Sequence, residues 1–418
     1  MHIVIVTVEL ASHNHPAGGL GSFTANIARI FAQNGHKVDI ILATTKEEKI
    51  IFDDAISVLP IYIKKALWEK IDKIAKLASF MLSENQDEIR RYLMNLYKAI
   101  CVRKLINSIN EREKIDIVHF CNHGALSLWH DKRIPYVIRI SGLLNIINGG
   151  ANQPNGSVEF NDNDMSIRHK LEFYTLKKAK YVISPSHLMA EIIKNNGGKH
   201  AEVIESPFVL NMENWDYGIY NTFVRDKRYI IHYGSLKYLK GTHIVAEIAE
   251  TILREYSDIV ILLAGSSAVM YDECGNTVKA HELVKKKAGK YESRVIYVGC
   301  LMREQLYPLI QKAELCLLPY RLENLSNACI EAMAMGKIVV GTNKASFEQL
   351  IDNRVNGFLC ERDNPGSYLR AVNEALALPK KERDQMGKRA KERIQKLAPD
   401  IIYTQYLNYY CEVIQKWK

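Results

Sequence analysis

The sequence predicts an α/β protein with two parallel sheets, because short apolar runs alternate with amphipathic helical segments and this alternation occurs twice along the chain. A length of 418 residues fits two or three domains. The 47% of hydrophobic and 25% of charged residues are close to globular averages, which excludes a disordered or collagen-like chain. Helical and strand periodicity fades near residues 207–223, so we expect one domain over residues 1–222 and another over 223–399.

The first half begins with a strand over His2–Val8, where Glu9 ends the apolar run, so this segment is not a signal peptide. A glycine-rich turn and an amphipathic helix over Ser22–Asn34 follow, and Gly35 ends the helix. Four further strands are expected in this half: Lys37–Leu42, Ile115–Phe120, Pro135–Ile140 and Tyr181–Ser184.

The segment Ile61–Lys114 has apolar residues at helical spacing in two stretches and predicts two helices. It carries 12 basic and 7 acidic residues, a large share of the net charge of +9. Two interpretations stand: ordinary solvated surface helices, or a basic face for an anionic or lipid-linked acceptor. Nucleic acid is not an expected partner, because no zinc-ligand spacing and no RNP-type strand occur.

The eight cysteines are scattered without a C-x-x-C pair, which favours a reducing compartment and argues against a structural zinc. No stretch reaches the roughly 18 apolar residues that a membrane span needs. We therefore expect a cytoplasmic protein that contacts the inner membrane face peripherally at most.

The second half repeats the pattern of the first. The last segment has Tyr403, Leu407, Tyr410 and Ile414 at helical spacing. The strands expected before it are Tyr229–Tyr233, Ile259–Ala264, Val295–Val298, Leu315–Leu318 and Ile338–Val340.

Two carboxylates, Glu323 and Glu331, stand eight residues apart around the start of a predicted helix that ends at Gly336. The helix N-terminus near Ser326 and Asn327 offers free N–H groups that suit a phosphate. A carboxylate ahead of the helix could accept from sugar hydroxyls, and one inside it from a ribose. A capped surface helix with an incidental glutamate explains the spacing equally well.

Two glycine-containing turns follow strands. Residues 234–241 read G-S-L-K-Y-L-K-G, and Lys240 there could neutralise a diphosphate as a point charge. Gly18-Gly-Leu-Gly21 allows close backbone approach to a phosphate or sugar. Neither turn is the G-x-G-x-x-G fingerprint of nicotinamide dinucleotide enzymes.

In this order, G-G-L-G, the turn that ends in Lys240 and Gly241, and E-x7-E running into E-A-M-A-M-G resemble the family-four retaining glycosyltransferases of the GT-B fold, relatives of glycogen synthase and sucrose-phosphate synthase. The resemblance implies two Rossmann-like domains facing a cleft, with the C-terminal helix, residues 400–418, returning to the first domain. It implies transfer of a hexose from a UDP-, GDP- or ADP-linked donor without a metal or other cofactor.

By the same resemblance, Lys240 contacts the donor diphosphate, Glu323 the donor sugar and Glu331 the ribose. The segment Asn324, Leu325, Ser326 and Asn327 supplies backbone contacts. Gly18 and Gly19, together with Gly234 and Ser235, belong to the expected donor site.

The chain departs from the family pattern at two places. Ser235 stands where members usually carry Arg, so phosphate neutralisation is one charge short unless another Arg reaches the site, and the candidates are Arg294, Arg303 and Arg321. Cys121 stands where members often have a working His, so His119 or His123 takes that part, unless both are structural.

We expect an envelope or polysaccharide glycosyltransferase acting on a glycan, lipid-linked or small-molecule acceptor. A nucleotide-sugar epimerase of the same fold and a non-catalytic nucleotide-sugar-binding module are the alternatives. Asp162-Asn-Asp164 matches a metal-binding D-x-D pattern, but lies away from the donor motifs, and we interpret it as a polar loop.

Overall fold

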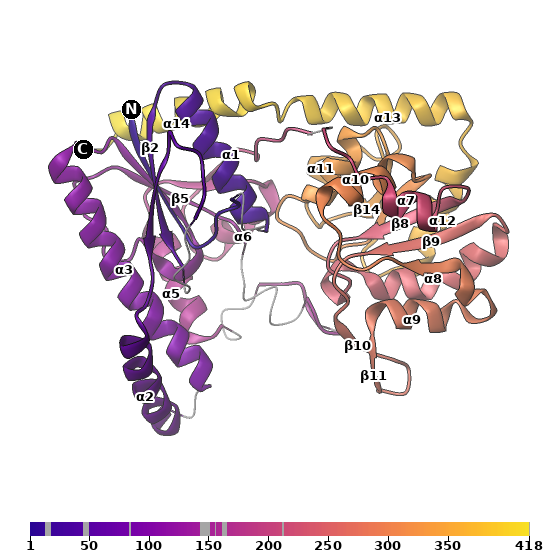
Figure 1. Cartoon of the computed structure of the whole chain (residues 1–418), viewed down its shortest axis with the longest axis horizontal. Coiled ribbons are helices and arrows are strands. Elements are labelled where there is room, and N and C mark those ends of the chain that lie inside the picture. Colours follow the sequence, from indigo (N-terminus) through magenta and orange to yellow (C-terminus); the bar gives the residue numbers. More distant parts are fainter. Residues whose placement is uncertain are drawn as a thin grey trace. The chain divides into compact units, whose positions relative to one another are not determined.

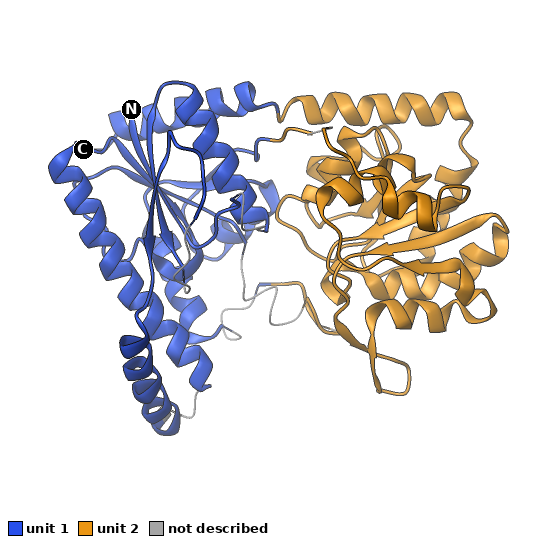
Figure 2. Ribbon diagram, in the orientation of Figure 1, with its two compact units in different colours: residues 1–145, 160–207, 398–418 blue, residues 146–159, 208–397 orange. Residues whose placement is uncertain are grey.

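The computed structural model describes residues 1–12, 18–44, 50–82, 85–142, 151–154, 156–160, 165–210 and 213–417. The chain forms two compact units (Figure 2). Unit 1 comprises residues 1–145, 160–207 and 398–418, and unit 2 comprises residues 146–159 and 208–397.

These limits correct the expected boundary at residue 222 in two ways. The chain passes from unit 1 to unit 2 after Pro207, and residues 146–159 belong to unit 2 although unit 1 surrounds them in sequence. The physical reason is Arg321, whose guanidinium donates hydrogen bonds to the carbonyl oxygens of Ala151, Gln153 and Gly156 at 2.7–3.1 Å.

Unit 1 is built on a sheet of seven parallel strands in the order β3-β2-β1-β4-β5-β6-β7. Its central strands are buried along their whole length, as expected of a sheet covered on both faces. The strands are β1 His2–Thr7, β2 Lys37–Ala43, β3 Ser57–Ile61, β4 Ile117–Cys121, β5 Tyr136–Arg139, β6 Val182–Ser184 and β7 Ala201–Val203.

The helices of unit 1 include a long hairpin of α2 and α3, which lies along one side of the unit (Figure 1). The expected start of α1 at Ser22 is three residues late, since this helix begins within the glycine turn. The helices are α1 Gly19–Gln33, α2 Lys65–Leu82, α3 Gln86–Arg112, α5 Ile167–Lys178, α6 His187–Asn195 and α14 Pro399–Gln415.

The C-terminal helix α14 packs on unit 1, as the sequence predicted. Tyr410 is fully buried, its ring stacks on Phe31 at 5.3 Å, and its hydroxyl lies 2.5 Å from Nδ1 of His119 in β4. Tyr403 reaches His36 in the same way, with 2.9 Å between the hydroxyl and Nε2. The last helix is therefore part of the core of unit 1.

Unit 2 contains a sheet of six parallel strands in the order β12-β9-β8-β13-β14-β15. This is the doubly wound arrangement, in which the strand order reverses between β8 and β13. The strands are β8 Arg228–Tyr233, β9 Ile259–Ala264, β12 Val295–Tyr297, β13 Leu315–Leu318, β14 Ile338–Thr342 and β15 Phe358–Cys360, and a separate antiparallel hairpin joins β10 Val269–Tyr271 to β11 Thr277–Lys279.

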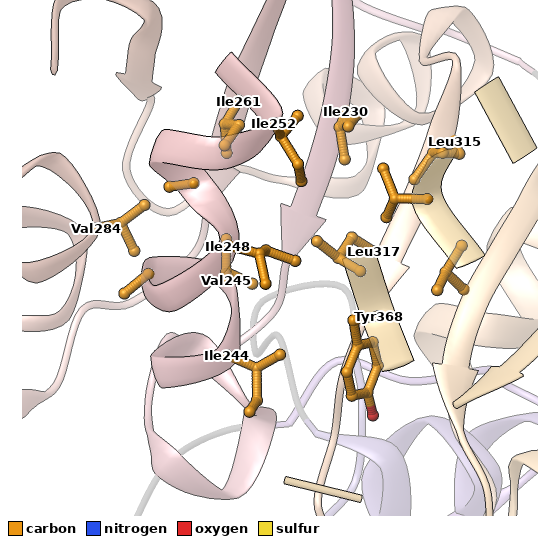
Figure 3. Packing of buried hydrophobic residues seen from close by; sticks show 14 of the residues in the cluster. Ile230, Ile244, Val245, Ile248, Ile252, Ile261, Val284, Leu315, Leu317 and Tyr368 are labelled. Atoms are coloured by element: carbon orange, nitrogen blue, oxygen red, sulfur yellow. The ribbon is translucent and has the colours of Figure 1, made fainter. Parts of the chain in front are cut away.

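Helices α8 and α9 cover one face of this sheet, and α10, α11 and α13 lie on the other (Figure 1). Ile244, Ile248 and Ile252 of α8 recur at a spacing of four residues and pack onto Ile230 of β8 and Ile261 of β9 (Figure 3). The helices are α7 Gly218–Phe223, α8 Thr242–Glu255, α9 Ala280–Lys287, α10 Arg303–Lys312, α11 Asn327–Ala334, α12 Pro365–Ala377 and α13 Lys380–Gln395.

The described residues include no helix with both the length and the apolar character required to cross a bilayer.

Removing the ring of Tyr410 should destabilise unit 1, because the change leaves a cavity against Phe31 and deprives His119 of its partner. We expect Tyr410→Ala to lower the free energy of unfolding by about 3–5 kcal/mol. Thermal unfolding followed by circular dichroism would measure the change. Cys411→Ala, on the exposed side of the same helix, is the control and should stay within about 0.5 kcal/mol of wild type; an equal loss in both variants would contradict the prediction.

Candidate functional site

The loops that follow β8 and β13 meet at the point where the strand order of unit 2 reverses. In open parallel sheets ligands bind at the carboxyl ends of the strands at such a point. The loop after β8 contains Gly234 and Lys240, and the loop after β13 contains Glu323. Both motifs that the sequence analysis singled out in the second half therefore reach one edge of one sheet.

A close backbone contact sets the distance between these loops. Gly241 has a φ of 66°, and a Cβ atom there would lie 1.8 Å from the carbonyl oxygen of Pro319. Beside it, the N–H of Arg321 donates to the carbonyl of Leu239 at 2.9 Å. Only glycine fits this position, and its small size lets the two loops touch.

This contact brings Lys240 and Glu323 together as an ion pair. The ammonium group also lies over the ring of Tyr320, 4.1 Å from the centroid. The two side chains are about a fifth exposed, at 19% and 23%, so solvent and ligands reach them. The arrangement offers a cation for phosphate and a carboxylate for hydroxyl groups side by side.

Lys237 is a second cation at this site, and the sequence analysis missed it. Burial lowers the pKa of its half-buried ammonium, and the charge of Lys240 lowers it further, whereas Glu323 opposes the shift. Its electrostatic neighbours are thus the members of the ion pair itself. Its place in the turn G-S-L-K, two residues after Ser235, was the available signal.

His232 lies in the core below the site and connects the elements that carry it. Its Nδ1 lies 2.9 Å from the carbonyl oxygen of Leu317 in β13, and its Nε2 lies 3.0 Å from Oγ1 of Thr242 in α8. Burial lowers the pKa of this fully buried imidazole to about 4, so it is neutral at physiological pH. It joins the two strands and the helix that carry the site.

A cavity of about 320 Å³ lies in unit 2 next to these loops, lined in part by Gly234, Ser235, Gly265 and Glu331. Gly265 has a φ of 132°, and a Cβ atom there would lie 1.7 Å from the carbonyl oxygen of Gly234, so the turns after β8 and β9 are in direct contact. The cavity is large enough to hold part of a nucleotide.

Glu331 projects from α11 into the lining of this cavity and is 7% exposed. The hydroxyl of Tyr307 donates to its Oε1 at 3.3 Å, and Nε of Arg303 lies 3.6 Å away. Burial raises the pKa of this carboxyl above its usual value, with Arg303 opposing the shift. The position of Glu331 is compatible with its expected contact to ribose, which stays a prediction.

Helix α11 begins at Asn327, and Ser326 is its N-cap, with Oγ accepting from the N–H of Cys329 at 3.3 Å. The first N–H groups of the helix, including that of Asn327, have no partner within the helix by its geometry. Leu325 is buried, and Asn324 follows Glu323 directly. The segment from Glu323 to Asn327 thus joins the ion pair to a helix N-terminus.

The expectation for Arg294 is wrong. Its guanidinium donates to the carbonyl oxygens of Leu253, Tyr256, Ser257 and Ile259, at the amino ends of the strands and away from Ser235. Arg303 pairs with Glu331, and Arg321 is held by Asp363 and by the carbonyls of residues 151–156. Lys237, rather than an arginine, is the additional cation beside Lys240.

The remaining candidates lie in unit 1. Gly18 precedes α1, and its N–H donates to the carboxylate of Glu9; Gly19 is the first residue of the helix. Asp162 and Asp164 lie outside the described residues.

His119 is a core residue and not a reacting group. It is 2% exposed, and the rings of Phe23, Tyr406 and Tyr410 surround it at 5.9–6.1 Å. Burial, together with the charge of Arg139, lowers its pKa to about 3. The sequence left open a catalytic role for His119, and the structure corrects this to a structural role.

His123 lies two residues beyond the end of β4 and lines a second cavity, of about 400 Å³, in unit 1. Its Nδ1 has no hydrogen-bond partner in the described part of the chain. Burial lowers its pKa to about 4, helped by Arg168 and His169, so the imidazole is neutral. Of the two histidines, His123 alone faces space that a ligand could fill.

Comparisons with known proteins match both halves of the chain. The family model described as Glycosyltransferase Family 4 matches residues 17–208, and that described as Glycosyl transferases group 1 matches residues 220–393. An uncharacterized glycosyltransferase of Methanocaldococcus jannaschii is 24% identical, over 90% of this chain and 89% of its own. Two Bacillus subtilis relatives are matched over only 42% of their own lengths.

Solved structures share the fold over the whole chain. Sucrose-phosphate synthase from Thermosynechococcus elongatus has a TM-score of 0.70 and 16% identity, covering 99% of this chain and 100% of its own. HepE from Anabaena, solved with UDP, has a TM-score of 0.66 and 15% identity with the same coverage. The two family models show that this chain belongs to the glycosyltransferases of family four, and the solved structures, together with the two doubly wound sheets, show that it has the GT-B fold.

Proposed function

We propose that the protein transfers a hexose from a nucleotide-sugar donor, held by unit 2, to a glycan, lipid-linked or small-molecule acceptor, as in the synthesis of envelope polysaccharides. One observation carries the proposal: Lys240 and Glu323 form a solvent-accessible pair at the carboxyl edge of the unit 2 sheet, beside the cavity that Glu331 lines. This edge is where doubly wound sheets bind nucleotides.

The donor roles follow from the chemistry of these groups. Lys237 and Lys240 neutralise the diphosphate, and the N–H groups at the start of α11 add to this. Glu323 accepts hydrogen bonds from sugar hydroxyls, and Glu331 from ribose. HepE was solved with UDP and with UDP-glucose, which makes a UDP-linked hexose the first donor to test.

The reaction we propose retains the anomeric configuration and needs no metal. The leaving diphosphate is stabilised by lysine and backbone N–H groups, which is electrostatic stabilisation in a partly buried site. The acceptor attacks from the face that the diphosphate leaves, so positioning matters more than a strong base.

A panel of UDP, GDP, ADP, CMP and dTDP tests the donor site. One nucleotide should raise the unfolding temperature, because ligand at about 100 times its Kd adds about 2.7 kcal/mol of stability. With the matching sugar donor, transfer should persist in EDTA, and proton NMR should show a product with the donor's anomeric configuration. Product formed without acceptor would indicate an epimerase. Nucleotide binding without turnover would indicate a binding module, and loss of activity in EDTA that a divalent ion restores would contradict metal independence.

Variants at the ion pair separate binding from transfer. Lys237→Met and Lys240→Met should each weaken nucleotide binding about 10- to 100-fold, because this is the loss in affinity that follows when one hydrogen bond to a charged group is removed. Glu323→Gln should lower kcat about 100-fold or more while nucleotide binding holds, because it removes the carboxylate that accepts hydrogen bonds from the donor sugar and orients it, whereas no contact to the nucleotide is lost. Isothermal titration and initial rates measure both.

The control for these variants is Lys279→Met, an exposed lysine of β11 in the same unit. If Lys237→Met bound nucleotide as tightly as wild type and as the control, Lys237 would have no part in neutralising the diphosphate.

We further propose that unit 1 contacts an anionic lipid bilayer through α2. Ile71 and Ala75 of this helix are buried, whereas Ile74, Leu77, Phe80 and Met81 are 56–88% exposed. Ile74, Leu77 and Met81 stand three and four residues apart, so they form one stripe. The exposed lysines of the helix include Lys70, Lys73 and Lys76. An apolar stripe with lysines around it fits a negatively charged membrane surface.

The basic face expected in the segment Ile61–Lys114 includes Lys64, Lys65, Arg90 and Arg91. Arg90 contributes less to it than expected, because it pairs with Asp72 and Asp87.

Vesicle sedimentation tests this contact. The protein should bind vesicles of phosphatidylcholine with phosphatidylglycerol more tightly than phosphatidylcholine alone. The double variant Leu77→Glu, Phe80→Glu should reduce binding about tenfold or more, because burying each apolar side chain contributes about 1.5–3 kcal/mol. Val269→Glu, an exposed apolar residue of unit 2, is the control. Equal binding by the double variant and wild type would exclude this surface.

A further inference from the structure

The second cavity, of about 400 Å³ within unit 1, is not explained by donor binding. It lies at the carboxyl ends of β1, β2 and β4, where the loops that follow these strands begin. These three strands are neighbours in the sheet. Glu9, Thr44 and His123 come from those loops. The other walls are α3, with Asn95 and Lys98, and α5, with Arg168 and Glu172. The position is the unit 1 counterpart of the site in unit 2.

Lys98 is an unusual group to find in such a wall. Its side chain comes from α3 and is only 6% exposed. Its ammonium donates one hydrogen bond, of 3.1 Å, to the carbonyl oxygen of Ala43, and it forms no ion pair with any described residue. A buried ammonium without a counter-charge is costly, so such groups are usually paired with an anion.

The other charged side chains of the cavity have partners or are close to neutral. Arg168 lies against Glu88, with Nε 3.4 Å from Oε2. Glu9 accepts from the N–H of Gly18. Glu172 is 5% exposed and accepts from the N–H of Gly124 at 2.8 Å, and burial raises its pKa to about 7. Lys98 is thus the cation of this wall that lacks a counter-charge among the described residues; burial lowers its pKa to about 8, so most of it is protonated at neutral pH.

The cavity also offers hydrogen bonds to hydroxyl groups. Nδ1 of His123 has no partner in the described part of the chain, and the amide of Asn95 both donates and accepts. The volume suits a small polar molecule of sugar size. A site that offers a cation and several hydrogen-bonding groups for hydroxyls is suited to bind an acidic polyol.

We propose that this cavity binds the acceptor of the transfer reaction, and that the acceptor is a polyol bearing a carboxylate or a phosphate that pairs with Lys98. The proposal rests on the proposed function, since it names the acceptor class of the same enzyme. His123 and Asn95 contact the hydroxyl groups, and Lys98 decides between charged and neutral acceptors.

Isothermal titration of the whole protein with three probes of the same ring size tests the proposal: glucuronate, glucose 6-phosphate and glucose. At least one of the two acids should bind about tenfold or more tightly than glucose, and the stronger of the two identifies carboxylate or phosphate as the preferred group. Lys98→Met should bring its affinity down to that of glucose. Lys104→Met, an exposed lysine on the same helix, should bind like wild type.

Asn95→Asp keeps the shape of the wall and adds a negative charge, so it covers the case in which Lys98→Met fails to fold. It should weaken binding of the acid about tenfold more than it weakens binding of glucose, because only the acid meets the added negative charge. Equal affinity for glucose and both acids, no binding of either acid, or wild-type affinity for the acid in both cavity variants would overturn the proposal.

Nucleotide binding, measured on the same samples, separates this inference from the proposed function. Both cavity variants should bind the donor nucleotide like wild type, because their side chains belong to unit 1. Failure of every nucleotide to bind wild type, together with selective binding of an acid, would refute the donor site and leave the anion site in place.

Discussion

The contact between the loops after β8 and β13 is the constraint on which the donor site depends. Gly241 lies against the carbonyl of Pro319, and the N–H of Arg321 donates to the carbonyl of Leu239. The two loops are therefore in direct contact through their backbones. Lys240 and Glu323 then meet as a consequence of that backbone contact. His232 holds the same strands together from below, as a neutral imidazole in the core. This rigid backbone support keeps the charged groups oriented without a ligand. Electrostatic stabilisation of a leaving group requires such preorganisation.

The charges of unit 2 bear on the proposed donor site, in which Ser235 stands where family members usually carry an arginine. Arg294 and Arg321 donate hydrogen bonds to backbone carbonyls, and Arg303 faces Glu331. In the function proposed above, neutralisation of the diphosphate falls to Lys237 and Lys240, whose ammonium groups are point charges on flexible stems that can rotate toward a ligand. Glu323 pairs with Lys240 in this structure, and the phosphate of the proposed donor competes with Glu323 for the ammonium.

The long central strands could be predicted from sequence because they are buried on both faces and read as continuous apolar runs, as in Ile259–Ala264. The short strands β3, β7 and β15 and the hairpin β10–β11 were not expected, whereas β6 and β12, which are no longer than β7 and β15, were. β3, β7 and the hairpin contain exposed residues that interrupt an apolar run, and β6 and β12 contain none. Lys240 and Glu323 were found by motif order, which does not depend on packing. Lys237, Lys98 and the true surroundings of Arg294 required the tertiary structure, since nothing local tells which end of a sheet a long side chain reaches.

The two histidines of unit 1 show how position relative to a strand end decides a residue's part. His119 lies inside β4, where its side chain faces α14 and is sealed by three aromatic rings. His123 lies just beyond the same strand, at the edge where parallel sheets bind ligands. Burial keeps both imidazoles neutral, with pKa values of about 3 and about 4. His123 is therefore suited to hydrogen bonding and not to donating a proton as an imidazolium. A neutral contact of this kind fits a reaction in which the acceptor is positioned and the departing diphosphate, not a protein base, governs the barrier.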